Sequence, residues 1–311
     1  MSKPGFLLTM PAAKNKKVII VEGPTAVGKT AVAIALAEHF KTEIISADSR
    51  QCYRELNIGV ARPLPAELQQ IKHHFIASHS IRDEVSAAGF EQYALKKAAE
   101  LFEQYENIVM VGGTGLYIKA FSEGLDEIPE TNPEIRKEII SKYEKNGLPW
   151  LQHEMSEKDP EFFKVGEIQN PQRMLRALEV IESTGKSILY FRKGKKAERD
   201  FSIVKIGLEL PKEQLHENIH QRTDKMIDEG LVQEVKSLQP YYKLNALQTV
   251  GYSEIFDYLN GKISLSEATR NIKTNTRRYA KRQMTWFRKD KEVKWFAPEE
   301  IDMIVSYIEN G

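Results

Sequence analysis

The chain has 311 residues, of which 41% are hydrophobic and 29% are charged. These values are ordinary for a soluble protein with one large domain or two smaller ones. No apolar run approaches the ~18 residues that a membrane span requires. The single cysteine, Cys52, excludes an internal disulfide and a cysteine-based zinc site, and we expect it to be a small buried filler. The N-terminus lacks the pattern of a secretory signal, so we expect a cytoplasmic protein.

The net charge of +1 conceals an uneven distribution. Residues 261–291 contain ten Lys or Arg and two Asp or Glu, which gives this segment a net charge of +8 (10 − 2). A basic segment in an otherwise acidic chain favours a polyanionic partner bound at one place. A solvated helix face is the alternative explanation.

The first third of the chain alternates between strand and helix patterns. Short apolar runs rich in β-branched residues predict buried strands at 16–22, 43–47 and 107–111. Helical spacing of apolar residues predicts helices at 30–40 and 86–106. This order indicates an α/β core with a parallel sheet and right-handed crossovers.

A helical insertion follows the third strand. Asn132-Pro133 and Asn170-Pro171 each begin a helix, and Gly147 and Gly185 end them. Residues 202–210 predict a strand that returns the chain to the sheet. Helices then follow from Pro211 and from a capping box at Ser264, the second of them basic. We therefore assign 1–125 and 200–311 to the core and 126–199 to the insertion.

The first predicted strand is followed by a G-x-x-x-x-G-K-[ST] motif, the phosphate-binding P-loop. Such a loop surrounds phosphate oxygens with backbone N–H groups at the N-terminus of a helix. Its lysine adds a point charge, and its hydroxyl residue, here Thr30, is a ligand for Mg²⁺. The residues of the motif are Gly23, Pro24, Thr25, Ala26, Val27, Gly28, Lys29 and Thr30.

An acidic residue follows the second predicted strand rather than the third. The third strand ends in Gly112-Gly113-Thr114, without the Walker-B acid of a typical nucleotide triphosphatase, whereas Asp48 follows the second strand. Ligands of open α/β sheets bind at the carboxyl ends of strands, so Asp48 is expected to face the phosphate site. From the residues alone it is a Mg²⁺ ligand, a ribose binder, a general base or a helix N-cap.

Five segments, in order, resemble the tRNA dimethylallyltransferase family: GPTAVGKT, SADSRQCYRELNIGVARP, VGGTGLYIKA, NPQRMLRALEV and LQTVGYSEI. The resemblance implies that dimethylallyl diphosphate binds with its diphosphate in the P-loop, together with Mg²⁺. N6 of adenosine 37, flipped out of the tRNA anticodon loop, then attacks the prenyl group and pyrophosphate leaves. It implies Asp48 as the base, with Thr25, Lys29 and Arg222 as further catalytic residues at the diphosphate. The P-loop of such an enzyme belongs to the nucleotide- and ATP-binding type, but its ligand here is a leaving group.

The resemblance also implies contacts with the anticodon stem-loop of tRNA. In the family the helical insertion closes over this stem-loop. On the basic helix, Tyr279, Trp286 and Phe287 are expected to be core residues rather than stacking platforms for bases. The positions that match tRNA-contacting segments are Asp48, Ser49, Arg50, Gln51, Thr114, Arg136, Gln172, Arg173, Met174, Leu175, Arg176, Gln248, Thr249, Val250, Gly251 and Tyr252.

Three other functions fit the P-loop. An isopentenyltransferase acting on free adenine nucleotides would use the same loop and base, but it needs neither the insertion nor the basic helix. A P-loop small-molecule kinase would transfer a phosphoryl group and consume ATP. A P-loop RNA-binding regulator would bind RNA without turnover. We expect a monomeric tRNA prenyltransferase that does not associate with membranes.

Overall fold

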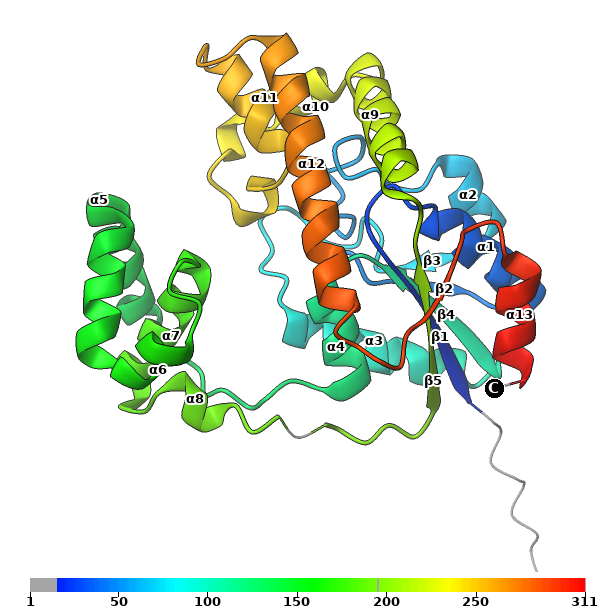
Figure 1. The fold of residues 1–311 in the computed structure, drawn as a ribbon, viewed down its shortest axis with the longest axis horizontal. Coiled ribbons are helices and arrows are strands. Elements are labelled where there is room, and N and C mark those ends of the chain that lie inside the picture. Colours follow the sequence, from blue (N-terminus) through cyan, green and yellow to red (C-terminus); the bar gives the residue numbers. More distant parts are fainter. Residues whose placement is uncertain (1–15, 195, 311) are drawn as a thin grey trace, which may run out of the picture. The chain divides into compact units, whose positions relative to one another are not determined.

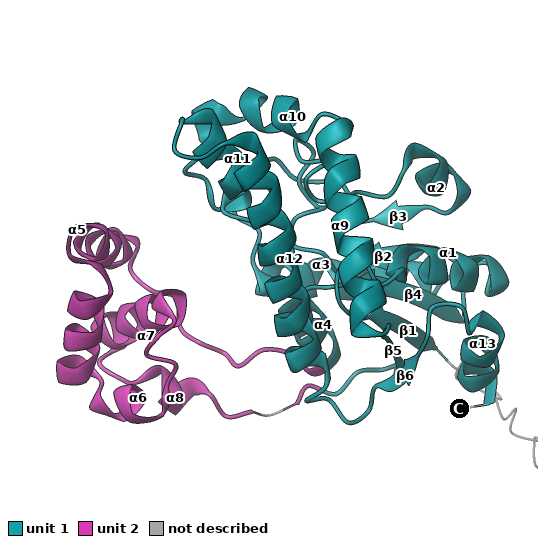
Figure 2. Ribbon diagram, turned by 45° about the horizontal axis from the view of Figure 1, so that its top comes forward, with its two compact units in different colours: residues 1–122, 198–311 teal, residues 123–197 magenta. Residues whose placement is uncertain are grey.

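The computed structural model describes residues 16–194 and 196–310. The chain divides into two compact units, one formed by residues 1–122 and 198–311 and the other by residues 123–197 (Figure 2). The larger unit contains the sheet and the smaller one is helical. Whether the smaller unit contacts tRNA stays a prediction.

The described residues form one parallel sheet of six strands in the order β3-β2-β4-β1-β5-β6 (Figure 1). The prediction of a parallel α/β core is confirmed. β3 and β6 were not predicted, because neither lies in an apolar run rich in β-branched residues like the one that marks β2. The strands are β1 (Lys17–Glu22), β2 (Ile44–Ser46), β3 (His73–His74), β4 (Asn107–Gly112), β5 (Ser202–Leu208) and β6 (Lys294–Phe296).

The strand order places the third predicted strand between the first two. β4 pairs with β1, where Glu22 lies opposite Gly112, and with β2, where Ser46 lies opposite Val111. The segments that follow β1, β4 and β2 therefore meet at one edge of the sheet. The P-loop, Gly113 and Asp48 are neighbours there although they are far apart in sequence.

Helices cover both faces of the sheet, so its central strands are apolar on both sides. Ile19 and Val21 of β1 belong to a core shared with α1 (Lys29–His39) and α13 (Ile301–Asn310). Val18 and Ile20 belong to a second core on the opposite face. Each such side chain, when fully buried, stabilises the fold by roughly 1.5–3 kcal/mol. The second core is shared with α3 (Ala87–Leu101), α4 (Gly115–Glu123), α11 (Tyr252–Leu259) and α12 (Leu265–Phe287).

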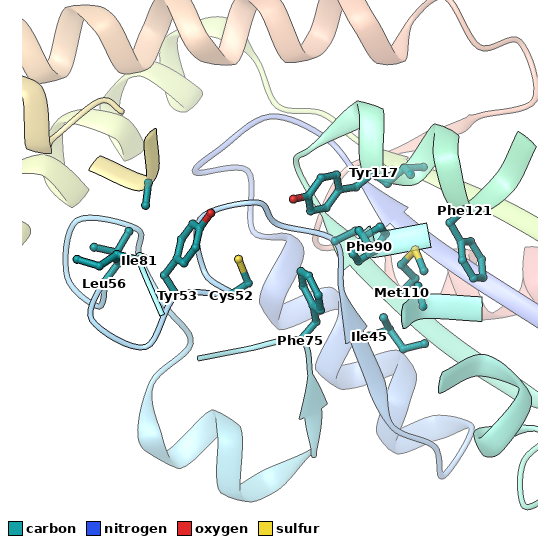
Figure 3. Close-up of a cluster of buried hydrophobic side chains, with 14 of the residues drawn as sticks. Ile45, Cys52, Tyr53, Leu56, Phe75, Ile81, Phe90, Met110, Tyr117 and Phe121 are labelled. Carbon is teal, nitrogen blue, oxygen red and sulfur yellow. The ribbon is translucent and has the colours of Figure 1, made fainter. Parts of the chain in front are cut away.

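Cys52 lies inside the second core, in the same buried cluster as Tyr53 and Phe75 (Figure 3). Its thiol is fully buried, and burial raises the pKa of Cys52 to about 12. A thiol with so high a pKa is a poor nucleophile. The prediction of a buried filler is confirmed.

The smaller unit contains α5 (Pro133–Lys158), α6 (Pro160–Val165), α7 (Pro171–Thr184) and α8 (Ile188–Phe191). Asn132 and Asn170 cap α5 and α7 with their side chains, as predicted. The prediction that Gly147 ends its helix is confirmed, because Gly147 adopts a φ of +72° and breaks the helical backbone. A second helix begins directly after it, with Pro149 in the first turn, where proline is tolerated, and the bounds of α5 span both helices.

The C-terminal part of the larger unit is helical and bends back over the sheet edge. Ser264 caps α12 by accepting a hydrogen bond from the backbone N–H of Glu267 at 3.2 Å. The remaining elements are α2 (Pro65–Gln70), α9 (Lys212–Asp228), α10 (Leu231–Ser237) and two 3₁₀ turns, η1 (Gln239–Tyr241) and η2 (Asn245–Leu247). In the described part of the chain, no helix combines the length and the apolar character needed to cross a membrane.

Candidate active site

The P-loop turns sharply between β1 and α1. Ala26 and Gly28 have positive φ angles of 66° and 102°, a region that L side chains other than those of Asn and Asp seldom adopt. Asn218 of α9 supports the turn, because its side-chain amide donates to the carbonyl oxygen of Ala26 at 3.1 Å. The loop is thus held from outside as well as by its own sequence.

A cavity of about 440 Å³ lies at the carboxyl edge of the sheet, beside the P-loop. Residues from the loop, from the ends of β2 and β4, and from α9 and α12 line it together. Three motif residues, Gly23, Pro24 and Val27, lie outside this lining, and the side chain of Val27 belongs to the core. The lining includes Thr25, Ala26, Gly28, Lys29, Thr30, Asp48, Gln51, Gly112, Gly113, Arg222, Tyr279 and Gln283.

Two partly buried cations lie beside Thr25. Lys29 donates to the carbonyl oxygen of Pro24 at 2.7 Å, and Arg222 donates to the Thr25 hydroxyl at 3.3 Å. Neither forms an ion pair with a carboxylate among residues 16–194 and 196–310. Burial and the neighbouring Arg222 lower the pKa of Lys29 to about 7, and burial lowers the pKa of Arg222. Positive charge buried in this way is stabilised by an anion, which the cavity has room to admit.

Asp48 lines the same cavity and is fixed by a turn. Its Oδ1 accepts hydrogen bonds from the backbone N–H groups of Arg50 (2.8 Å) and Gln51 (3.2 Å). Of the alternatives for Asp48, a helix N-cap is wrong, because the following residues form a turn and not a helix. Oδ2 makes no hydrogen bond within the described residues, so one carboxylate oxygen is available to a ligand.

The end of β4 packs tightly against the Asp48 turn. A Cβ at Gly112 would lie 2.2 Å from the carbonyl oxygen of Ala47, so only glycine fits this position. The Thr114 hydroxyl accepts a hydrogen bond from the backbone N–H of Ser49 at 3.0 Å. Thr114 therefore supports the Asp48 turn, and a contact of Thr114 with adenosine stays a prediction.

Sequence reasoning missed two residues that α12 brings to the cavity. Tyr279 was expected in the core, but it retains 37% of its surface, and the Arg282 guanidinium lies 5.7 Å from its ring centroid. Gln283, one turn later, is buried and hydrogen-bonded to both Thr25 and Gly113. The expectation of core packing holds for Phe287, which is buried. Trp286 is partly buried against the same core.

Three residues that were expected to contact tRNA have buried side chains, and these expectations are wrong for side-chain contacts. Met174 and Leu175 point into the core of the smaller unit, because they lie on the apolar face of α7. Tyr252 is fully buried and donates its hydroxyl to Glu234 at 2.6 Å. Val250 is partly buried against the same core as Tyr252.

The polar residues of α7 that were expected to contact tRNA lie outside that core. Gln172 and Arg173 are exposed, and Arg173 forms a surface ion pair with Glu167. Arg176 and Arg136 both contact the buried carboxylate of Glu179, at 3.4 Å and 3.2 Å. Two cations on one acid leave a net positive charge at this surface, so contact with tRNA stays a prediction that the charges favour.

The other expected tRNA positions belong to loops of the larger unit. Gln51 donates to the carbonyl oxygens of Val60 and Ala61 and so holds the loop that lines the cavity. Gln248 is exposed, while Arg50 and Thr249 are partly exposed and Gly251 begins α11. For these residues, contact with RNA stays a prediction.

The cations of α12 gather in part around a second cavity, of about 650 Å³, between α9 and α12. Arg277, Arg278 and Lys281 of α12 line it together with Lys212 of α9. Other cations of the helix are paired, for example Lys273 with Asp224 at 2.7 Å. The basic segment therefore forms a local cationic groove and not only a solvated helix face.

These features define a class of protein: a P-loop α/β fold in which the cavity beside the loop is lined by two cations, Lys29 and Arg222, and by the carboxylate of Asp48. The family model described as IPP transferase matches residues 51–290, which is more than half of the chain. The protein belongs to the IPP transferase family.

Relatives and solved structures agree with this assignment. The tRNA dimethylallyltransferase of Christiangramia forsetii is 48% identical, over 94% of this chain and 97% of the relative. That of Cytophaga hutchinsonii is 46% identical, over 95% and 97%. The full-length tRNA isopentenylpyrophosphate transferase of Bacillus halodurans matches with a TM-score of 0.70 at 35% identity, covering 96% of each chain. A eukaryotic dimethylallyltransferase acting on tRNA matches with a TM-score of 0.72 at 26% identity, over 88% of this chain and 70% of that one. The family resemblance seen in the sequence is confirmed.

The low pKa of Lys29 predicts that pyrophosphate binding takes up a proton. Above about pH 7 the free protein carries a neutral Lys29. A bound anion favours the ammonium form and raises this pKa again, so the affinity for pyrophosphate falls as the pH rises through that value. Calorimetry at about pH 8 in two buffers of different ionisation enthalpy measures the proton uptake.

Pyrophosphate itself gains and loses protons in the same pH range. The proton uptake of wild type is therefore compared with that of the variant Lys29→Met. We expect this variant to bind pyrophosphate more weakly and to lose the part of the proton uptake that belongs to Lys29. The exposed lysine Lys262 provides the control Lys262→Met, which should behave as wild type. Equal proton uptake in wild type and Lys29→Met would contradict the assignment.

Proposed function

We propose that the protein transfers a dimethylallyl group from dimethylallyl diphosphate to N6 of adenosine 37 in the anticodon loop of tRNA, with release of pyrophosphate. The observation that carries the proposal is the meeting of two partly buried cations, Lys29 and Arg222, with the carboxylate of Asp48 at one cavity. The relatives named tRNA dimethylallyltransferase support tRNA as the acceptor.

The residues of the cavity have separate tasks in this reaction. The bond between C1 of the prenyl group and the diphosphate oxygen breaks, and the bond between N6 and C1 forms. The diphosphate leaves with the bonding electrons, and Lys29 and Arg222 stabilise its charge. N6 loses a proton, which Oδ2 of Asp48 accepts. A P-loop that stabilises a leaving group needs no Walker-B acid, in agreement with the Gly-Gly-Thr sequence after β4.

The cavity also fits a magnesium ion carried by the diphosphate. Mg²⁺ is commonly held by one or two protein oxygens together with substrate phosphates and water. The Thr30 side chain, at the start of α1, lines the cavity and would hold the ion. The described residues contain no cluster of three or more His, Cys, Asp or Glu that could bind a metal without substrate. Bound Mg²⁺ would supply further charge neutralisation to the departing pyrophosphate.

We further propose that the anticodon stem-loop is held by the arginines of α7 and by the cations of α12. Lys and Arg contacts to phosphates supply the sequence-independent part of nucleic-acid affinity. Adenosine 37 lies in a single-stranded loop, where flipping a base costs least. We propose that the enzyme acts as a monomer in the cytoplasm, where its tRNA substrate is found.

Transfer of label from dimethylallyl diphosphate tests this function. The protein is incubated with the labelled donor, Mg²⁺ and either unmodified tRNA or AMP. We expect label in tRNA, and only when adenosine 37 is present. Label in AMP would instead identify an enzyme of free nucleotides, and ATP consumption without label transfer would identify a kinase.

The variant Asp48→Asn tests the role of Asp48 as a base while keeping the turn that this residue holds. An asparagine Oδ1 still accepts the two backbone hydrogen bonds that hold the turn, but the amide cannot accept the proton of N6. We expect kcat to fall by about 10²- to 10⁴-fold while the Kd for tRNA is unchanged. Single-turnover rates and filter binding measure the two quantities.

The matched control is Asp83→Asn, because exposed Asp83 also accepts a backbone hydrogen bond, from Ser80 at 2.7 Å, and lies outside the cavity. This variant should retain wild-type turnover. Unchanged turnover in Asp48→Asn would remove Asp48 as the base.

Arg173→Ala tests the tRNA surface of the smaller unit. Its ion pair with Glu167 is exposed and contributes little to stability, so the fold should be retained. We expect weaker tRNA binding, with the slope of log K against log salt reduced by about 1, and an unchanged Kd for dimethylallyl diphosphate. An unchanged salt slope would show that Arg173 does not contact phosphate.

A further inference from the structure

We propose that Gln283 of α12 is a positioning residue for prenyl transfer, because its carboxamide ties the P-loop at Thr25 to the end of β4 at Gly113. The inference rests on the proposed function and adds to it a residue that does not touch the reacting atoms. The link joins two sequence segments that each contribute to the cavity.

The carboxamide is held at both of its ends. The backbone N–H of Thr25 donates to Oε1 of Gln283 at 2.9 Å, and Nε2 of Gln283 donates to the carbonyl oxygen of Gly113 at 2.9 Å. The residue is 7% exposed, so little water competes for these bonds. This pattern needs an acceptor and a donor side by side, which asparagine and glutamine alone provide with a neutral amide. Gln283 is therefore chemically specified at this position.

Gly113 is the residue that admits this carboxamide. A Cβ at position 113 would lie 2.4 Å from Nε2 of Gln283 and 3.8 Å from Nζ of Lys29. The first distance is shorter than real Cβ contacts, so any larger residue would displace the amide. The Gly112-Gly113 pair thus has two tasks, since Gly112 approaches Ala47 and Gly113 approaches Gln283.

The hydrogen bond between Gln283 and Thr25 sets the conformation of the P-loop, residues 23–30, which we call the diphosphate cradle. In this structure the Thr25 N–H points to Gln283, while the Thr25 hydroxyl accepts from Arg222. Gln283 therefore fixes the backbone from which the Thr25 hydroxyl meets the partly buried Arg222. Loss of the carboxamide would free this N–H and loosen the Thr25–Arg222 contact.

The hydrogen bond from Gln283 to Gly113 connects α12, through Thr114, to the turn that holds Asp48. Thr114, the next residue, donates its N–H to Ala47 and accepts from Ser49 with its hydroxyl, on either side of Asp48. The resulting path runs from Thr25 through Gln283 and the Gly113-Thr114 segment to the Asp48 turn. Gln283 thereby sets the spacing between the diphosphate cradle and the base, and misplacement of reacting groups by about 1 Å can cost about 10²-fold in rate.

Two substitutions test the role of the carboxamide. Gln283→Met keeps the length of the side chain and removes both hydrogen bonds. Gln283→Glu keeps the acceptor for Thr25 N–H, but its carboxylate cannot donate to Gly113. A protonated glutamic acid can do both, and burial at this position favours the neutral acid, so lowering the pH should restore the link.

We expect Gln283→Met to lower kcat by on the order of 10- to 100-fold, with little change in the Kd for tRNA. For Gln283→Glu, the ratio of its kcat to that of wild type should rise as the pH falls from about 8 to about 6. Lys29, Arg222, Asp48 and Tyr279 line the same cavity in both proteins, so the ratio removes the pH effects that the two proteins share. The control is Gln221→Met on the exposed side of α9, which should match wild type.

Thermal melting and circular dichroism establish that each variant is folded. A folded Gln283→Met with kcat within about threefold of wild type would overturn the proposal. So would a deficit of Gln283→Glu that is constant across this pH range, because a merely structural amide gives no pH-dependent rescue. If Gln283→Met does not fold, the test rests on the pH dependence of the ratio of the Gln283→Glu kcat to the wild-type kcat. Failure of wild type to label tRNA would instead overturn the proposed function, which separates the two outcomes.

Discussion

Partly buried positive charge, in direct ion-pair contact with no carboxylate of the described residues, is the constraint on which the cavity depends. Lys29 and Arg222 lie on either side of Thr25, and each donates to an uncharged oxygen rather than to a carboxylate. The cost of this arrangement is visible in the lowered pKa of Lys29. A ligand diphosphate removes that cost, so the cradle binds an anion most strongly at the moment when the leaving group gains its charge. The fold thereby favours the products of bond cleavage at this position over a neutral occupant.

The strand order places the P-loop and the Asp48 turn on two sides of one site. Because β4 lies between β1 and β2, the Gly112-Gly113 segment separates the P-loop from the Asp48 turn. A larger residue at either position would push against Ala47 or Gln283. The absence of a carboxylate after β4 is therefore a steric requirement as well as a chemical one. An acid there would occupy the space that joins the two sides, whereas Asp48 reaches the cavity from the next strand.

The parts of the site that the sequence predicts are those made by contiguous residues. The P-loop motif, the strand before it and the Ser264 cap are local, and the structure confirms them. Gln283 contacts Thr25 across 258 positions of the sequence, and neither a periodicity nor a motif predicts such a contact. The prediction that the side chains of Met174 and Leu175 contact tRNA is wrong for a related reason. They stand inside a motif that resembles an RNA-contacting segment, but on a helix a contiguous motif includes residues of both faces. Both residues lie on the apolar face of α7, and the spacing of apolar residues along that helix is the better guide to their burial.

The position of Gln283 on α12 joins the basic helix to the chemistry. Arg278, Lys281 and Arg282 lie within about one and a half turns of Gln283, and Tyr279 lies one turn before it on the cavity side. A helix transmits a displacement along its axis with little loss, because its backbone hydrogen bonds resist stretching. In the proposed function, the cations that would bind tRNA phosphates lie on the same helix that fixes Thr25 and Gly113. An enzyme whose acceptor is tRNA gains from this arrangement, since a free nucleotide could not reach the helix surface and the cavity at once.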